Sequence, residues 1–322
     1  MIEPNPASWE RATLEKLALR ALEEQRRARQ WATLVRLLWI TLLFLVVAAA
    51  LGWIGGSASE PIRTGKHTAL VELRGVIGVE SRASADRIIQ ALNAAFKDRH
   101  TQGVVLRINS PGGSPVQSGY INDEIRRLRA KYPEIPLHAV VQDLCASGGY
   151  YVAVAADRIY VDKASLVGSI GVIMSSFGFT GTMEKLGVER RAYTAGDNKD
   201  FLDPFAPENP AHREHAMRML DEIHQQFIKT VRDGRGKRLK ESPEIFSGLV
   251  WTGERAVQLG LADGLGSLDS VAREVIKAET VVDFTPEENY LEQLSKRLGA
   301  NAAQSLLKAL SELPAGAAAS LR

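Results

Sequence analysis

The chain has 322 residues, of which 45% are hydrophobic and 24% charged, a composition typical of a globular protein with an added apolar segment. Its 40 lysines and arginines nearly balance its 38 aspartates and glutamates, so no strong charge favours nucleic acid as a partner. The single cysteine, Cys145, excludes an internal disulfide and a zinc site built from cysteines, and no GxxxxGK[ST] loop points to the use of ATP.

An apolar segment near the N-terminus predicts a membrane anchor. Residues 37–54, LLWITLLFLVVAAALGWI, carry no charge and are long enough to cross a bilayer core of about 30 Å. Arginines cluster before this segment, so the positive-inside rule places residues 1–36 in the cytoplasm and the rest of the chain outside. A cleaved signal peptide is the alternative, since Gly56, Ser57 and Ala58 offer a small-residue cleavage site. The long region before the apolar segment favours an uncleaved, single-pass anchor.

The remainder of the chain alternates between strand and helix patterns. Short apolar runs predict strands, and apolar residues spaced three and four apart predict helices. The predicted strands are 69–73, 76–79, 103–108, 137–141, 158–161 and 171–173, and the predicted helices are 85–96, 114–131, 211–231 and 287–313. Strands separated by glycine turns and helices favour an α/β fold with a largely parallel sheet. We therefore expect a basic cytoplasmic segment, an anchor, a linker, a catalytic domain and a C-terminal amphipathic helix with its tail, at 1–36, 37–56, 57–66, 67–284 and 285–322 respectively.

A corner of small residues, Ala146-Ser147-Gly148-Gly149, follows one of the predicted strands and precedes a helical pattern. Glycine permits a tight turn, and the start of a helix offers unpaired N–H groups to an anion. Ser147 therefore lies where a nucleophilic serine would have an oxyanion site beside it, although a helix N-cap is the alternative role for a serine there. A second glycine turn, Gly112-Gly113, is expected at the same edge of the sheet, so amides near Gly113 and Gly148 could form the two halves of an oxyanion hole.

A serine nucleophile needs a base to remove its proton. The six histidines do not offer a persuasive Ser-His-Asp set; His212 and His215 stand at i and i+3 on a predicted helix, where a solvated face is favoured over a metal site. A lysine can serve if burial or a nearby cation lowers its pKa from about 10.4 toward neutrality. Lys199, in a glycine-bearing polar loop followed by aromatic residues, is the candidate. The residues permit a Ser147–Lys199 dyad but do not establish it, because most loop lysines are solvated.

Five stretches of the expected catalytic domain follow one another along the chain in the order found in one known protein family. They are NSPGGS (109–114), ASGGYYVA (146–153), VGSIGV (167–172), AGDNKDFLDPF (195–205) and WTGERAVQLGLADGLG (251–266). This set resembles the signal peptide peptidase A family of membrane-anchored serine proteases. The resemblance implies that Ser147 is the nucleophile and Lys199 the general base, with Gly113 and Gly148 in the oxyanion hole. It also implies that Ser169 orients the lysine amine.

The same resemblance implies a Clp-protease/crotonase-like fold, in which repeated β-β-α units form a superhelix, preceded by one N-terminal transmembrane helix. The implied activity is ATP-independent endoproteolysis without a cofactor or metal, directed at remnant signal peptides after secretion. The implied assembly is a ring-shaped homo-oligomer in the bacterial inner membrane, with the N-terminus in the cytoplasm and the catalytic domain on the periplasmic side. Whether the dyad forms within one subunit or between neighbours stays open.

Some features depart from the family pattern or leave other functions open. Cys145 stands two residues before Ser147, where a small inert residue is expected, and Leu249 stands where the family often has arginine. The N-terminal segment and the C-terminal helix fall outside the motifs. The alternatives are an acyl-CoA hydratase on the same fold, whose glycine-turn amides would hold a thioester enolate, and a non-catalytic membrane scaffold. The apolar anchor and the Ser/Lys pairing favour the peptidase.

Overall fold

The computed structural model describes residues 25–27, 29–45 and 65–286. The chain divides into two units, of which residues 63–287 form one and the two terminal segments the other. One described helix, Gln25–Leu45, is long and apolar enough to cross a membrane, a criterion that an N-terminal signal sequence also meets. The predicted anchor, residues 37–56, shares residues 37–45 with this helix. Residues 46–56 of the anchor and the helix predicted at 287–313 lie outside the described residues.

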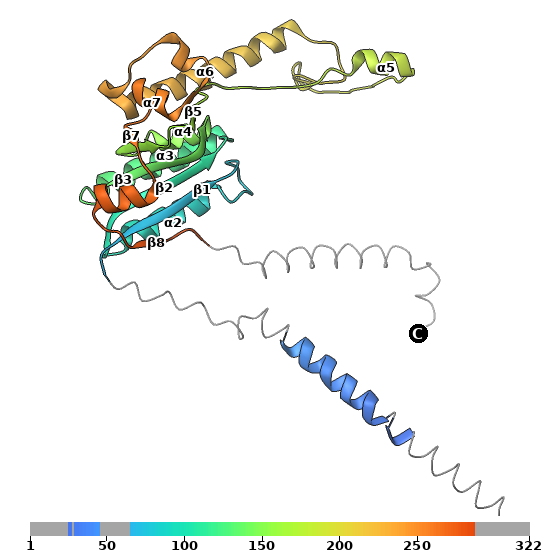
Figure 1. Ribbon diagram of the computed structural model, residues 1–322. Coiled ribbons are helices and arrows are strands. Elements are labelled where there is room, and N and C mark those ends of the chain that lie inside the picture. Colours follow the sequence, from blue (N-terminus) through green and yellow to red (C-terminus); the bar gives the residue numbers. More distant parts are fainter. Residues whose placement is uncertain (1–24, 28, 46–64, 287–322) are drawn as a thin grey trace, which may run out of the picture. The chain divides into compact units, whose positions relative to one another are not determined.

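The unit of residues 63–287 is built on one mixed, mostly parallel sheet (Figure 1). Its strands within the described ranges are β1 (His67–Arg74), β2 (Thr101–Ser110), β3 (Leu137–Ala146), β4 (Arg158–Val161), β5 (Leu166–Gly168), β6 (Val250–Thr252), β7 (Gly264–Leu265) and β8 (Val281–Asp283). They lie in the order β6-β5-β3-β2-β1-β8, and β4 pairs with β3 and β7. Every pair except β5–β6 is parallel. The predicted α/β class with a largely parallel sheet is confirmed.

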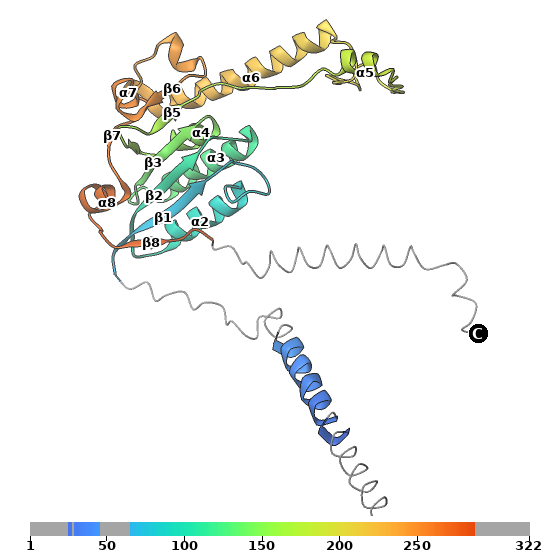
Figure 2. The same ribbon diagram turned by 45° about the vertical axis from the view of Figure 1, so that its right-hand side comes forward.

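The helices α2 (Ala85–Lys97) and α3 (Pro115–Lys131) connect successive parallel strands and lie on the same side of the sheet (Figure 2). Ser114 ends the turn before α3, where its hydroxyl accepts a hydrogen bond from the Gln117 amide, and Pro115 occupies the first helical turn, where its missing N–H costs nothing. The apolar faces of both helices are buried against alternate residues of β1, β2 and β3. This core fixes the carboxyl ends of the strands, where the glycine turns emerge.

The remaining helices are α4 (Gly148–Ala153), α5 (Thr180–Leu186), α6 (Pro210–Arg235), α7 (Gly253–Gln258) and α8 (Leu268–Ser270), with short 3₁₀ segments at Gly236–Arg238 and Pro243–Phe246 and a π-helical turn at Val271–Ile276. A buried ion pair fastens the end of α6: the Arg235 guanidinium donates to both carboxylate oxygens of Asp263 at 2.8 and 3.0 Å. Burial favours the neutral acid, but the hydrogen bonds and charge of Arg235 outweigh it and hold the pKa of Asp263 below its usual value.

Residues 172–209, which we call the arm, leave the sheet after β5 and return as α6, with α5 at the far end (Figure 1). None of them is buried, and several large apolar side chains are strongly exposed, among them Phe177 at 79% and Tyr193 at 91%. The two limbs of the arm are joined by a stacked Phe179–Phe205 pair. Since a segment of this length without a buried residue has no core of its own, its apolar side chains form an uncovered surface.

Two predicted strands are wrong. Residues 76–79 form no strand; Ile77 makes an isolated bridge to Gly113, because the chain turns at Gly75 (φ +88°) and runs alongside the glycine turn. Residues 171–173 start the arm, and the strand after β4 is instead β5, which pairs with the last residues of β3. The helices expected at 85–96, 114–131 and 211–231 are confirmed as α2, α3 and α6, with slightly different ends.

Candidate active site

Ser147 occupies the turn between β3 and α4 in a strained conformation, with φ +52° and ψ −123°. A non-glycine residue in this region costs on the order of 1–3 kcal/mol, and such strain concentrates at functional sites. The Ser147 amide donates to the Gly168 carbonyl at 2.8 Å, which holds the turn against the end of β5. Ser147 stands at the N-cap position of α4, but its hydroxyl makes no capping hydrogen bond, so capping does not account for the side chain. The turn therefore presents a half-buried hydroxyl at the carboxyl end of a central strand.

The glycine turn after β2 lies in direct contact with this corner. A Cβ added at Gly112 would lie 2.7 Å from both the Gly148 nitrogen and the Ser147 Cβ, and one added at Gly148 would lie 3.2 Å from the Gly113 nitrogen. The amides of Gly113 and Gly148 are therefore close neighbours beside Ser147. Within the described residues, neither N–H donates a hydrogen bond to protein. Two such donors beside a hydroxyl form the arrangement that an oxyanion hole requires.

Ser169 lies next to Ser147 at the end of the neighbouring strand, because β5 pairs with β3 in a register that matches Ala146 with Gly168. It is a second strained residue, with φ +53°. Its amide donates to the Leu249 carbonyl at 2.8 Å, a contact that any residue at 249 would supply, and the Leu249 side chain is exposed. The departure at Leu249 therefore leaves the backbone of the corner intact.

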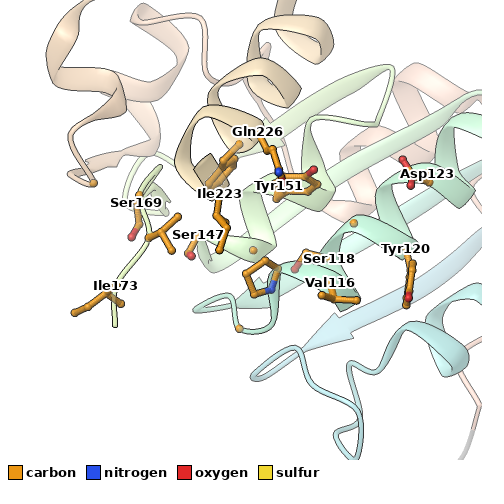
Figure 3. Close-up of a pocket in the computed structure, with 18 of the residues that line it drawn as sticks. Val116, Ser118, Tyr120, Asp123, Ser147, Tyr151, Ser169, Ile173, Ile223 and Gln226 are labelled. Carbon is orange, nitrogen blue, oxygen red and sulfur yellow. The ribbon is translucent and has the colours of Figure 1, made fainter. Parts of the chain in front are cut away.

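A cavity of about 850 Å³ opens over the corner. Gly113, Gly148, Ser147 and Ser169 all line it, so four of the five residues expected at the site are brought together. Figure 3 shows Ser147 and Ser169 toward one end of this cavity and Asp123 at the other. The rest of the lining is mostly apolar or small and comes from five places: the first half of α3, Tyr151 of α4, residues 171–173 where the arm begins, the middle of α6 and residues 247–248. The shape and lining suit an extended apolar peptide.

Lys199 is not among the residues that line this cavity. It is an exposed residue of a turn in the arm, where its amide donates to the Gly196 carbonyl at 3.2 Å. In a single chain, therefore, the structure does not bring Lys199 to Ser147.

The loop that carries Lys199 is fastened to the first turns of α6. His212 is buried, and its Nε2 lies 3.1 Å from the Asn198 Oδ1. Phe201 packs its ring against His212 at 5.3 Å and against His215 at 5.6 Å. The expectation of a solvated face is therefore wrong for His212, because the loop folds back over it. No cluster of three potential metal ligands occurs within the described part of the chain.

Cys145 is buried beneath the corner, and burial raises the pKa of its thiol well above the ordinary value. A thiol held neutral is a poor nucleophile, so Cys145 is a packing residue.

The sequence of this chain is similar to those of several known proteins. A family model described as peptidase family S49 matches residues 129–282. A putative protease of Methanocaldococcus jannaschii is 32% identical over 215 residues, which are 65% of this chain and 68% of that protein. A putative signal peptide peptidase SppA of Enterococcus faecium is 31% identical over 193 residues, 58% of this chain and 56% of that protein. This chain belongs to peptidase family S49.

A higher identity, 49% over 182 residues, is found with a Brucella melitensis protein named Na(+)/H(+) antiporter NhaA. This chain spans a quarter of that protein's length, and the match covers 56% of this chain. Because three quarters of the antiporter-named protein have no counterpart in the match, its name does not carry over. Membership of the S49 family and the protease-named relatives support a peptidase of the serine type.

Several lining residues were not foreseen from the sequence. They are Ser118, Tyr120, Asp123, Tyr151, Ile223, Gln226 and Phe227. The α3 residues repeat at helical spacing beside the glycine turn, and that periodicity is a signal that could have identified them. The α6 residues carry no such signal, since only packing of α6 against α4 brings them over the corner.

Proposed function

We propose that this chain is a membrane-anchored, ATP-independent serine endopeptidase with Ser147 as nucleophile and Lys199 as general base. The observation that carries the proposal is the strained Ser147 beside two amides that donate to no protein group in the described part of the chain, all lining one mostly apolar cavity. A chain that used this corner only for packing would gain nothing from the strain. Family S49 membership supports the same reaction class.

The proposed reaction has two stages. The neutral Lys199 amine takes the hydroxyl proton as Ser147 Oγ attacks the peptide carbonyl, and the amides of Gly113 and Gly148 hold the oxyanion. The resulting ammonium then donates that proton to the leaving amine, and an acyl-enzyme remains. In the second stage Lys199 removes a proton from water as the water attacks the ester, and the ammonium then returns that proton to the leaving Ser147 Oγ, which frees Ser147 and releases the acid product. Ser169 lies near the Lys199 amine in this arrangement and orients it. Activity is expected to rise with pH as the lysine loses its proton.

The arm supports the further proposal that the dyad is shared between subunits of a ring-shaped homo-oligomer. A lysine must be desolvated or placed near a cation to be a base near neutral pH, whereas Lys199 is exposed in one chain. If the arm of one copy packed on a neighbouring copy, the apolar side chains of the arm would be buried and Lys199 would reach the cavity of that neighbour. Such head-to-tail contacts close into rings.

We propose for the whole chain the division into segments expected above, with the body outside the inner membrane and remnant signal peptides as substrates. The apolar cavity supports this substrate class, because signal peptides have apolar cores. The repeated strand–helix connections at β1–α2–β2–α3–β3 support the Clp-protease/crotonase-like superhelix. The apolar helix Gln25–Leu45 supports the anchor.

A complementation experiment on the full chain in detergent tests the proposal. Ser147→Ala and Lys199→Ala would be assayed on an apolar peptide singly and after co-expression, with Lys185→Ala, another exposed lysine of the arm, as the matched control. We expect both single variants to be inactive and Lys185→Ala to be active. In a randomly mixed ring, about one interface in four joins an intact Ser147 to an intact Lys199, so roughly a quarter of the activity should return.

Each other outcome has a definite meaning. If mixing restores nothing, the dyad lies within one chain and the shared arrangement is wrong. If Lys199→Ala keeps near-normal activity, the general base is another group. If Ser147→Ala remains active, the proposed nucleophile is wrong.

A further inference from the structure

Within the part of the chain that the structure describes, one carboxylate lines a cavity whose other lining residues are uncharged. Among the lining residues, Asp123 is the charged side chain, and the others are glycines, hydroxyl and amide residues, or apolar residues. Asp123 is exposed on α3, on the same face as Val116, Gly119 and Tyr120, which also line the cavity. These residues of α3 follow the groove away from Ser147, and Asp123 lies farthest along it (Figure 3).

The cations nearest to Asp123 on its own helix are engaged elsewhere. The Nε of Arg126 donates to Asn122 Oδ1 at 2.8 Å, and Arg127 donates from two nitrogens to the two oxygens of Glu124, both at 2.7 Å. No ion pair of Asp123 is found within the described residues. Its negative charge therefore faces the groove without an internal counter-ion.

We propose that Asp123 forms a subsite for a basic side chain of the substrate, so that the enzyme prefers apolar peptides that carry a lysine or arginine near the cut. The proposal rests on the proposed function, since it takes Ser147 as the point of cleavage. A carboxylate at the edge of an apolar groove attracts a basic side chain of the peptide and repels an acidic one. The groove thereby selects among peptides without weakening its binding of their apolar residues.

The geometry sets the position of the basic residue. Ser118 marks the point where α3 meets the corner, because a Cβ added at Gly148 would lie 2.5 Å from its Oγ. Asp123 follows five residues later, about 7.5 Å along a helix that rises 1.5 Å per residue. An extended peptide advances about 3.3 Å per residue, so the basic side chain belongs to roughly the second to fourth residue from the scissile bond. Since the groove leads from Ser147 toward Asp123 in one direction, the preference is confined to one side of the cut.

The test uses the full chain in detergent and one apolar peptide whose cleavage site has been mapped by mass spectrometry. Lysine, norleucine or glutamate would be placed at each of the second to fourth positions on either side of the cut, and kcat/KM would be measured at low and high salt. For wild type we expect kcat/KM about two- to fivefold higher for lysine than for norleucine on one side, the size of an exposed ion pair, with glutamate lowest. The preference should shrink at high salt, because exposed charges are screened.

Variants separate the subsite from a structural effect. Asp123→Asn should abolish the preference for lysine over norleucine, and Asp123→Lys should reverse the order of lysine and glutamate. Asp86→Asn, which removes an exposed helical carboxylate away from the cavity, should change neither. A lysine preference that is absent in wild type, or that survives in both Asp123 variants, would overturn the proposal. Failure of wild type to cleave any of the peptides would instead count against the proposed function.

Discussion

Substitution of Gly113 by alanine tests how far catalysis depends on the backbone of the corner. A Cβ at Gly113 would lie 2.1 Å from the Ile77 carbonyl oxygen, and the residue has φ +150°. A Cβ does not approach a non-bonded oxygen within about 3 Å, so the backbone must move by on the order of 1 Å. That movement displaces the Gly113 amide from the oxyanion position. Loss of one oxyanion donor costs about 10²–10³-fold in kcat, or roughly 2.7–4 kcal/mol of transition-state stabilisation.

The assay for Gly113→Ala is kcat and KM on an apolar peptide, together with the thermal unfolding midpoint. Gly75→Ala is the matched control: Gly75 has φ +88°, lies in the segment beside the same turn and has no atom within 4 Å of an added Cβ. It should lose about 1–2 kcal/mol of stability from backbone strain and keep its kcat. If Gly113→Ala stays folded with wild-type kcat, the Gly113 amide does not hold the oxyanion. If Gly75→Ala loses as much kcat, the effect is strain alone.

Three further predictions concern the frame of the site. Arg235→Met should lower the free energy of unfolding by about 3–5 kcal/mol in urea at neutral pH, because it leaves Asp263, whose side chain is only 11% exposed, without its main partner. This loss should shrink as the pH falls below about 3.8, where the unfolded-state carboxyl takes a proton and the wild-type pair also weakens. Burial lowers the pKa of His138 in the folded protein, so wild type should lose stability as the pH falls below about 6.5, where the unfolded chain binds a proton before the folded one does. His138→Phe should make the free energy of unfolding depend less on pH in this range. An unchanged dependence on pH would refute this. His212→Ala should reduce kcat up to about 100-fold by releasing the Lys199 loop, and His212→Gln should restore part of it; equal kcat in both variants would show that the contact does not position Lys199.

The elements that the sequence predicts well are those whose signals are local. The helix after Ser114 has its cap, its proline and its apolar spacing within one short stretch, and α2 and α6 are similarly periodic. Residues 76–79 are as apolar as a strand, but strand formation depends on a partner at the right register, and the turn at Gly75 removes it. The register between β5 and the last residues of β3 is likewise a long-range property.

The same distinction separates the parts of the candidate site. Ser147 and the glycine turn at 112–113 could be placed together because both follow parallel strands, whose carboxyl ends share one edge of the sheet. The wall that α6 contributes could not be foreseen, since it depends on how Phe227 packs against Tyr151. Nor could it be foreseen that Lys199 does not line the cavity, because nothing in its own loop shows that the arm leaves the domain.

The central claim is that Ser147 is the nucleophile, and a covalent label tests it most directly. The full chain in detergent would be treated with a fluorophosphonate, which forms a stable ester with activated serine hydroxyls, and the adduct would be located by peptide mass mapping. We predict one adduct, on Ser147, formed in step with loss of peptidase activity and absent from Ser147→Ala. Loss of activity with the adduct on another serine, or full activity in a chain labelled at Ser147, would contradict the account.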